Sequence, residues 1–201
     1  RAAFERALAI DSQAFGPDHP DVAICVNNLG AVLHDLGDLP AARAVFERAL
    51  AIDERTFGPD HPEVATDVNN LGSVLQAQGD LPGARAAFER ALAIDERTFG
   101  PDHPTVATDV NNLGSVLQDL GDLPAARAAF ERALAIDERI FGLDHPKVAI
   151  DVGNLGRVLK AQGDLAGASA AFKRALDIFE QRLPPEHPYI KTARRLLESV
   201  R

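Results

Sequence analysis

The chain has 201 residues, of which 46% are hydrophobic and 25% are charged, and its formal net charge is −9. This balance is ordinary for a globular chain, and the negative charge argues against a general nucleic-acid binder, which needs a basic surface against phosphates. No apolar run reaches the roughly 18 residues of a transmembrane helix, so we expect no membrane partner. Cys25 is the only cysteine, which excludes an internal disulfide and favours a cytoplasmic location.

The sequence repeats with a period of 42 residues. The period is fixed by Pro20, Pro62, Pro104, Pro146 and Pro188, and again by Gly30, Gly72, Gly114 and Gly156. Such a period is typical of a solenoid, because one unit cannot bury its apolar face alone and stacks on its neighbours to share a core. No segment shows sustained alternation of apolar and polar residues, so we expect an all-α protein without a sheet.

The repeat divides residues 1–201 into a single array. Residues 1–16 match the second helix of a unit whose first helix is missing, so we expect the protein to continue upstream of Arg1. Four complete units follow, at residues 17–58, 59–100, 101–142 and 143–184. Residues 185–201 are predicted to form a C-terminal capping helix with a charged outer side, which terminal units of repeat proteins require.

Each complete unit is predicted to be a helical hairpin, and the unit at 59–100 serves as the example. Its first helix begins at the Asp60-His61-Pro62-Glu63 segment, with Asp60 as the capping residue, and ends at Gly79. The apolar spacing predicts one buried face on each helix: Val64, Val68, Leu71 and Leu75 on the first, and Ala84, Phe88, Ala91 and Leu92 on the second. The second helix ends at Gly100-Pro101, and its repeated Glu-Arg pattern is typical of a solvated face with i,i+4 ion pairs.

A glycine recurs inside the first helix of every unit, where it costs about 1 kcal/mol relative to alanine. In the unit at 59–100 this residue is Gly72. We expect the cost to be offset by close approach of the two helices, with Gly72 facing the small residues Ala84 and Ala91.

The repeated residues resemble the signature of the tetratricopeptide repeat family. The resemblance rests on Asn70-Leu71-Gly72, Leu75, Gly79-Asp80, Ala84, Phe88 and Ala91. The 42-residue period and the FGPDHP connection look like the kinesin-light-chain-type subclass, which also occurs in bacterial proteins that resemble NB-ARC or STAND signalling ATPases. The resemblance implies a right-handed α-solenoid, a superhelix of antiparallel helix pairs whose first helices line a concave groove. One departure is that Val68 and Leu75 stand where the family often places a large aromatic residue.

The predicted partner-binding residues lie on these first helices. The amides are Asn27, Asn28, Asn69, Asn70, Asn111, Asn112 and Asn154, and they are accompanied by Thr66, Ser73, Gln76, Thr108, Ser115 and Gln118. A stack of amides suits an extended peptide, because each amide both donates and accepts hydrogen bonds. The alternative is that one asparagine of each pair bonds the neighbouring unit and sets the stacking, and the pattern alone does not decide between the two roles.

Positive charge gathers at the C-terminal end of this row. Residues 143–201 carry 10 Lys or Arg and 7 Asp or Glu, against an acidic remainder, and the fourth unit has Arg157 and Lys160 on the predicted groove. We therefore expect a protein or peptide partner that is acidic where it meets this unit.

No catalytic or metal site is predicted. Five histidines share one position in the repeat, but equivalent positions of stacked helices lie roughly 8–10 Å apart, too far for one zinc, so we expect them to bond backbone near the helix starts. The sequence has no phosphate-binding loop, nucleophile elbow or HExxH motif, so we expect no enzyme activity and no cofactor.

The function predicted from the sequence is a protein-protein interaction module that binds a partner in its concave groove. It would be the C-terminal sensor or scaffold region of a larger signalling protein. The alternative is an architectural arm that mediates self-assembly without a peptide ligand, with self-association through the incomplete N-terminal end. The sequence upstream of Arg1 discriminates further contexts, because a phosphate-binding loop would indicate a STAND-type sensor and a heptad coiled coil an adaptor like kinesin light chain.

Overall fold

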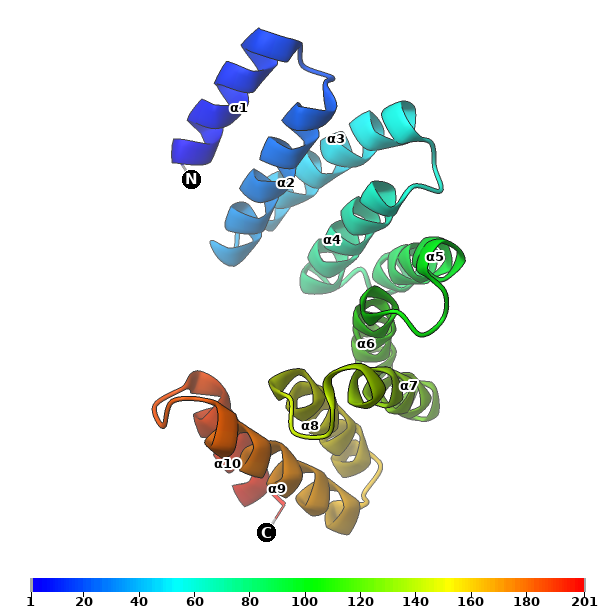
Figure 1. Ribbon diagram of the computed structural model, residues 1–201, viewed down its shortest axis with the longest axis vertical. Helices are drawn as coiled ribbons and strands as arrows, with labels where there is room; N and C mark the ends of the chain where they lie inside the picture. Colours follow the sequence, from blue (N-terminus) through cyan, green and yellow to red (C-terminus); the bar gives the residue numbers. More distant parts are fainter. Residues whose placement is uncertain (1, 201) are drawn as a thin grey trace. The chain divides into compact units, whose positions relative to one another are not determined.

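The computed structural model describes the backbone of residues 2–200 and the side chains of residues 6–200, and these residues form ten α-helices and no strand (Figure 1). The helices are α1 (Ala2–Phe15), α2 (Pro20–Asp35), α3 (Leu39–Phe57), α4 (Pro62–Gln78), α5 (Leu81–Phe99), α6 (Pro104–Asp119), α7 (Leu123–Phe141), α8 (Pro146–Ala161), α9 (Leu165–Arg182) and α10 (Pro188–Glu198). The predicted all-helical repeat fold is confirmed. None of the described helices is both long and apolar enough to cross a membrane.

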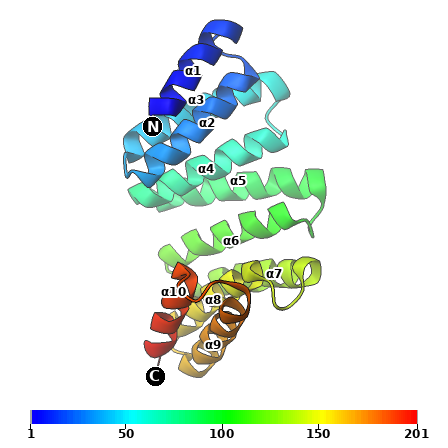
Figure 2. The same cartoon turned by 60° about the vertical axis from the view of Figure 1, so that its left-hand side comes forward.

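The chain falls into two compact units, residues 1–100 with α1–α5 and residues 101–201 with α6–α10. Within each unit consecutive helices run in opposite directions, as in the hairpins α2/α3, α4/α5, α6/α7 and α8/α9 (Figure 2). We call α2, α4, α6 and α8 the first helices of the repeats and α1, α3, α5, α7 and α9 the second helices. The division of the array into repeats of 42 residues stays a prediction.

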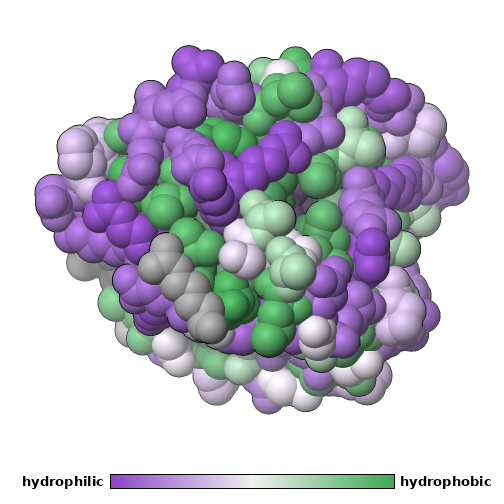
Figure 3. Space-filling model, turned by 90° about the horizontal axis from the view of Figure 1, so that it is seen from below, coloured by the Kyte–Doolittle hydropathy of each residue, from purple (hydrophilic) through white to green (hydrophobic). Residues whose placement is uncertain are grey.

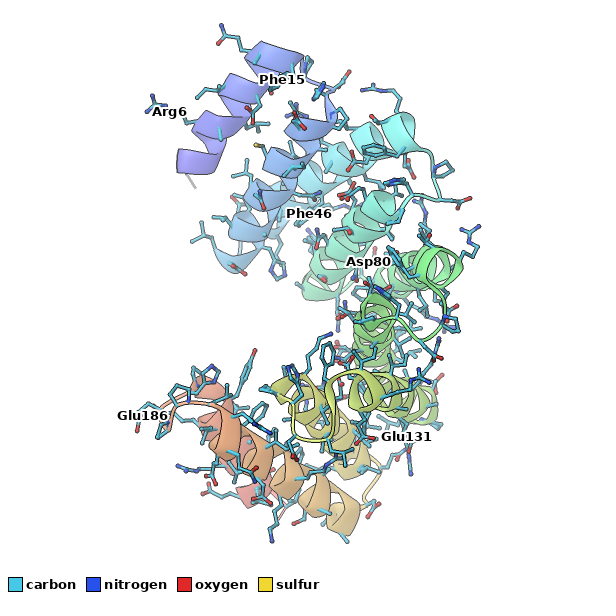
Figure 4. All side chains as sticks on the ribbon, in the orientation of Figure 1. Arg6, Phe15, Phe46, Asp80, Glu131 and Glu186 are labelled. Atoms are coloured by element: carbon cyan, nitrogen blue, oxygen red, sulfur yellow. The ribbon has the colours of Figure 1, made fainter. Side chains whose placement is uncertain are left out.

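The core of the first unit lies within and between the hairpins. Val22 and Val26 of α2 pack with Ile52 of α3 in one cluster, and Phe46 of α3, labelled in Figure 4, packs with Val74 of α4 in the next. In the second unit, Leu117 of α6, Phe130 of α7 and Val158 of α8 form a similar cluster, and α8, α9 and α10 share the largest. Each cluster takes residues from neighbouring hairpins, so no hairpin buries its apolar face alone.

The first helices begin at a histidine, not at the aspartate predicted as the cap. The side chain of His61 accepts a hydrogen bond from the backbone N–H of Glu63, at 3.2 Å, and Asp60 instead bridges Arg97. The same cap occurs at His19, His103, His145 and His187. The Asp60 prediction was wrong because the ring lies on the preceding phenylalanine, Phe57, with 4.5 Å between the ring centroids, which directs Nδ1 to the helix start. The predicted bonding of these histidines to backbone is confirmed.

The helix ends use the predicted glycines in two conformations. Gly79 ends α4 in the left-handed region, with φ 84° and ψ 5°. Gly100 ends α5 with φ 85° but ψ 160°, so its φ is positive while its ψ is that of an extended chain. A side chain is strained at both positions, so the repeat needs glycine there for its backbone conformation alone.

The glycine inside each first helix makes room for a phenylalanine ring, not for the small residues predicted to face it. A Cβ on Gly72 would lie 2.8 Å from the ring of Phe88, and a Cβ on Gly114 would lie 2.9 Å from the ring of Phe130. Close approach between the two helices is therefore present, but it joins a backbone to a ring. The large aromatic residue of the hairpin lies on the second helix and covers the glycine of the first.

Ion pairs cover the outer side of the second helices. The predicted i,i+4 pairs are confirmed for Arg43 with Glu47, Arg85 with Glu89 and Arg127 with Glu131, at 2.7–2.8 Å. Further pairs join adjacent repeats within a unit: Arg90 with Glu54, and Arg174 with Glu138, both at 2.6 Å. Such exposed pairs contribute about 0–1 kcal/mol each, so they orient the second helices more than they stabilise them.

Candidate partner-binding site

The fifteen residues predicted to bind a partner all lie on the first helices, and none of them is buried. Asn28, Thr66, Thr108 and Arg157 are exposed. The remaining eleven are half-buried: Asn27, Asn69, Asn70, Ser73, Gln76, Asn111, Asn112, Ser115, Gln118, Asn154 and Lys160. A partner-binding role for these residues stays a prediction.

The amides make hydrogen bonds between adjacent repeats. Asn27 of α2 donates through Nδ2 to Oδ1 of Asp67 on α4, at 2.5 Å. Asn154 of α8 donates through Nδ2 to Oδ1 of Asn111 on α6, at 3.0 Å. These contacts support the stacking role for three of the seven asparagines, and they orient the amides by bonds that exist without a partner.

The hydroxyl groups on this face are bonded to their own helices. Thr66 donates to the carbonyl oxygen of Pro62 at 3.3 Å, and Ser73 donates to that of Asn69 at 3.2 Å. In the second unit Thr108 donates to the Pro104 carbonyl oxygen and accepts from Lys147 Nζ at 3.4 Å. A threonine or serine bonded in this way keeps an acceptor lone pair but has used its donor, so these residues favour donors on a partner.

The fourth repeat departs from the others in charge. Lys160 Nζ donates to the Ser199 hydroxyl at 2.8 Å, which ties α8 to the residue that follows α10. Arg157 is exposed and makes no hydrogen bond or ion pair with any residue whose side chain the structure describes. Its guanidinium group therefore has all five donors available to a carboxylate.

Arg157 borders a pocket of about 170 Å³ between α8, α9 and α10. The walls are mostly apolar and include Ile150, Phe172, Phe179 and Tyr189. Apolar surface framed by hydrophilic side chains is visible on the face shown in Figure 3. We call this space, with Arg157 at its border, the C-terminal pocket.

A glycine substitution contributes to the C-terminal pocket. Gly153 lines it and stands where the earlier repeats have Asn27, Asn69 and Asn111. A Cβ built on Gly153 has no neighbouring atom within 4 Å, so the space above α8 is open at this position. The sequence signal was the interrupted asparagine row, but only the structure shows that the missing side chain borders apolar walls.

Sequence reasoning missed the buried aspartates. Asp53 of α3 and Asp67 of α4 are 4% and 0% exposed, and their carboxyl groups are close enough for Asp53 to raise the pKa of Asp67. Asp137 of α7 and Asp151 of α8 form the same kind of pair, at 2% and 3% exposure. The signal available was spacing, because Asp67 lies one turn after Val64 on the apolar face of its helix and both pair members recur every 42 residues.

Burial raises the pKa of these carboxyl groups. The pKa of Asp67 rises to about 7 because burial penalises the ionised form and Asp53 adds repulsion, against a smaller opposing effect of the Asn27 hydrogen bond. The pKa of Asp151 rises to about 8 through burial and the adjacent Asp137, with Lys147 opposing. Burial also raises the pKa of Asp53. The residues whose side chains are described include no group of three His, Cys, Asp or Glu arranged to hold a metal ion.

Comparison with known proteins identifies a repeat family and several similar solved structures. A tetratricopeptide repeat profile matches residues 1–55, 24–67 and 105–181, and a second profile of the same description matches residues 68–105. No curated protein sequence matches. Among solved structures, BtubC (BKLC) from P. vanneervenii is similar with a TM-score of 0.83 and 20% identity, over 99% of this chain and 80% of that one.

A second solved structure, from Podosopora anserina, is described as a kinesin light chain with nearly identical TPR-like repeats. It is similar with a TM-score of 0.77 and 23% identity, over 90% of this chain and 86% of that one. Identities this low show a shared fold alone. Because the family profile covers more than half of the sequence and the helix hairpins have the corresponding fold, the chain belongs to the tetratricopeptide repeat family.

Proposed function

We propose that the chain binds a segment of a partner protein along its first helices, with an acidic part of that segment at the fourth repeat. Tetratricopeptide repeats generally mediate protein-protein interactions, which gives the general function. The observation that carries the proposal is the C-terminal pocket, where an unpaired arginine borders an apolar hollow.

The chemistry of the C-terminal pocket suits an apolar side chain next to a carboxylate. Binding sites are typically concave and mostly apolar, with a few polar groups that fix orientation. Here Phe172 and Phe179 supply apolar wall, and Arg157 and Asn154 supply the polar groups. An arginine can hold a carboxylate through two parallel hydrogen bonds, which lysine cannot do, so Arg157 is the expected anchor of the acidic group.

The test uses peptides on an array, each with one leucine or phenylalanine flanked by Asp or Glu, beside matched peptides flanked by Lys. Wild type is expected to retain the acidic set. The double variant Arg157→Glu with Lys160→Glu should keep the melting temperature and lose this set. The wild-type signal should fall with added salt, because an ion pair at the protein surface is screened.

Two control variants separate charge from shape. Lys173→Glu makes the same charge change per residue on an exposed part of α9 away from the C-terminal pocket, and should leave retention unchanged. Gly153→Asn restores the side chain of the earlier repeats and should weaken binding without any change of charge. Equal retention of acidic peptides by wild type and the double variant would contradict the acidic partner.

A self-assembly arm is the second candidate, and one observation favours it. Ile10 of α1 is 56% exposed, whereas its equivalent Ile52 of α3 is 2% exposed because α2 covers it. Phe15 is also exposed on α1, so this helix presents an apolar surface. If it mediates self-association, sedimentation should show concentration-dependent oligomers that Ile10→Asp converts to monomers. Oligomers that persist in Ile10→Asp would exclude this surface.

The wider context stays a prediction. Placement as the C-terminal sensor or scaffold region of a larger cytoplasmic signalling protein depends on residues outside this sequence. Extension of the sequence upstream of Arg1 tests it directly, because a phosphate-binding loop supports a STAND-type sensor and a heptad coiled coil supports an adaptor.

A further inference from the structure

Adjacent repeats within each unit meet at a recurring pair of positions. One member lies on a second helix and the other lies 14 residues later, on the helix that follows. We call these positions the junction pair. The junction pairs inside the two units are Asp11 with Cys25, Asp53 with Asp67, Asp137 with Asp151, and Phe179 with Ala193.

In both acidic junction pairs, one oxygen atom of each carboxyl group is left without a hydrogen-bond partner. In the first, these atoms are Oδ1 of Asp53 and Oδ2 of Asp67, which are buried, and the two carboxyl groups are close enough to affect each other's ionisation. In the second, the corresponding atoms are Oδ1 of Asp137 and Oδ2 of Asp151. An ionised carboxylate donates no hydrogen bond, so contact between two of them inside the fold requires a proton on one.

In the first junction pair the two side chains are joined by a hydrogen bond whose donor is a thiol. Cys25 stands at the position of Asp67 and Asp151, and its Sγ donates to Oδ2 of Asp11 at 2.8 Å. A thiol supplies one hydrogen to the aspartate, as a protonated carboxyl group would. The position therefore carries a hydrogen donor when its residue is cysteine, which is independent support for a proton when its residue is aspartate.

We propose that a single shared proton joins the two aspartates of each acidic junction pair, and that it links the stacking of α3 on α4 and of α7 on α8 to pH. The proton lies between Oδ1 of the residue on the second helix and Oδ2 of the residue on the following first helix. Each pair then carries one negative charge, and loss of the proton leaves two buried charges in contact.

The groups around the first acidic pair decide how it titrates. Asn27 of α2 holds Oδ1 of Asp67, which fixes that carboxyl group and favours its ionised form. Glu63 of α4 opposes ionisation of both aspartates, and His61 at the start of α4 favours it for Asp53. Burial exceeds each of these effects and places the pKa of Asp67 at about 7.

The second acidic pair has a cation beside it. Lys147 of α8 lies 3.6 Å from Oδ2 of Asp137 and favours ionisation of Asp151, whereas Glu138 of α7 opposes it. A small cavity of about 130 Å³ reaches both aspartates and is bordered on α6 by Thr108 and Asn111. The cavity gives the shared proton a path for exchange, and burial still raises the pKa of Asp151 to about 8.

The sign of the pH effect follows from these directions. The pKa values of Asp67 and Asp151 are both raised above the value of about 3.9 expected in the unfolded chain, so folding takes up protons at pH values between the unfolded and folded pKa. Their stabilising contribution is complete below about pH 4 and is lost as the pH rises through 7 and 8. The Cys25 thiol does not titrate in this range, because its hydrogen bond to Asp11 and burial raise its pKa to about 11.

The experiment compares melting temperatures of the full 201-residue chain from pH 6 to pH 9. Wild type should lose several degrees over this range. Asp67→Asn and Asp151→Asn each replace the protonated acid by an amide that can donate the same hydrogen bond, so each should remove part of the loss and the double variant most of it. Asp35→Asn, on a side chain that is 85% exposed, removes the same formal charge and should retain the wild-type slope. An unchanged slope in the folded double variant would overturn the proposal.

A spectroscopic experiment on the wild-type chain tests the proposal even if the variants fail to fold. Wild type labelled with ¹³C at the aspartate carboxyl groups should show an infrared band of protonated carboxyl at pH 6 that disappears by pH 9. Cys25→Asp should add intensity to this band and steepen the pH dependence, since it converts the thiol bridge into an acidic pair. Absence of the band at pH 6 in the folded wild-type chain would overturn the proposal.

Discussion

The junctions α7/α8 and α9/α10 occupy equivalent places in the second unit but use opposite chemistry. The first is closed by Asp137 and Asp151, and the second is closed by Phe179 and Ala193, which are 5% and 4% exposed. Phe179 also packs against Tyr189, with 5.4 Å between the ring centroids. The same helix stacking is thus compatible with two acids that share a hydrogen bond or with an aromatic ring over alanine.

The difference teaches where stability and binding surface arise in this fold. Burying two acids is costly, and replacing buried ionic groups by apolar ones of similar volume is often neutral or stabilising. The apolar junction is therefore expected to hold α10 with little dependence on pH. It also supplies Phe179 as a wall of the C-terminal pocket, so this apolar pocket lies at the junction that lacks an acidic pair.

The largest expected effect comes from placing an acid in the apolar junction. Phe179→Asp puts a carboxyl group opposite Ala193 with no partner, and should lower the free energy of unfolding by about 3–5 kcal/mol in urea titrations at pH 8.5. Adding Ala193→Asp rebuilds an acidic pair and should recover part of this loss at pH 6 but not at pH 9. Phe179→Leu, which keeps an apolar side chain, should cost less than about 1.5 kcal/mol.

The next prediction tests whether the repeats differ only at their junctions or also inside their hairpins. Gly114→Leu and Gly156→Leu each force a side chain against a buried ring, Phe130 or Phe172, and each should cost about 3 kcal/mol or more of unfolding free energy. Equal losses at both sites would show that the hairpins themselves are the same.

A neighbouring glycine provides the control for the two leucine variants. Gly153→Ala adds a Cβ that meets no atom within 4 Å, so helix propensity should give a gain of about 1 kcal/mol. A Gly114→Leu protein more stable than wild type would mean that α6 and α7 do not approach at this point.

The smallest effect converts the acidic junction into the apolar one. Asp137→Phe with Asp151→Ala should raise the free energy of unfolding by about 1 kcal/mol at pH 8.5, where Asp151 of wild type is mostly ionised, and by less at pH 6. Chemical unfolding at the two pH values measures this difference. A larger gain at pH 6 than at pH 8.5 would contradict the assigned direction of titration.

The sequence was sufficient for the helices because the 42-residue period, the turn glycines and the apolar faces agree with one another. It failed where a side chain's role depends on its neighbours in the next repeat. Asp60 looked like a cap, but Arg97, 37 residues later, holds it and leaves the cap to His61. The burial of Asp67 was not predicted, and only the packing of α3 on α4 shows that this residue is fully buried beside Asp53.

The positions of the candidate site residues could be predicted from the sequence, but their hydrogen-bond partners could not. The repeat placed Arg157 on the same helix face as Ser73 and Ser115, and the uneven distribution of charge along the sequence singled out the fourth repeat. That Lys160 is held by Ser199 while Arg157 stays unpaired depends on where α10 ends, which periodicity does not specify because the last helix departs from the repeat.

The unlike junction at α9/α10 has a consequence for folding fidelity. Near-identical repeats compete for the same partners, and misassembly between neighbours is a characteristic failure of such chains. If α10 docked against α7 instead of α9, Ala193 would face Asp137 and leave its carboxyl group buried without a hydrogen donor. The pair of Phe179 with Ala193 therefore favours docking of α10 on α9 over docking of α10 on α7, even though the repeats are nearly identical in sequence.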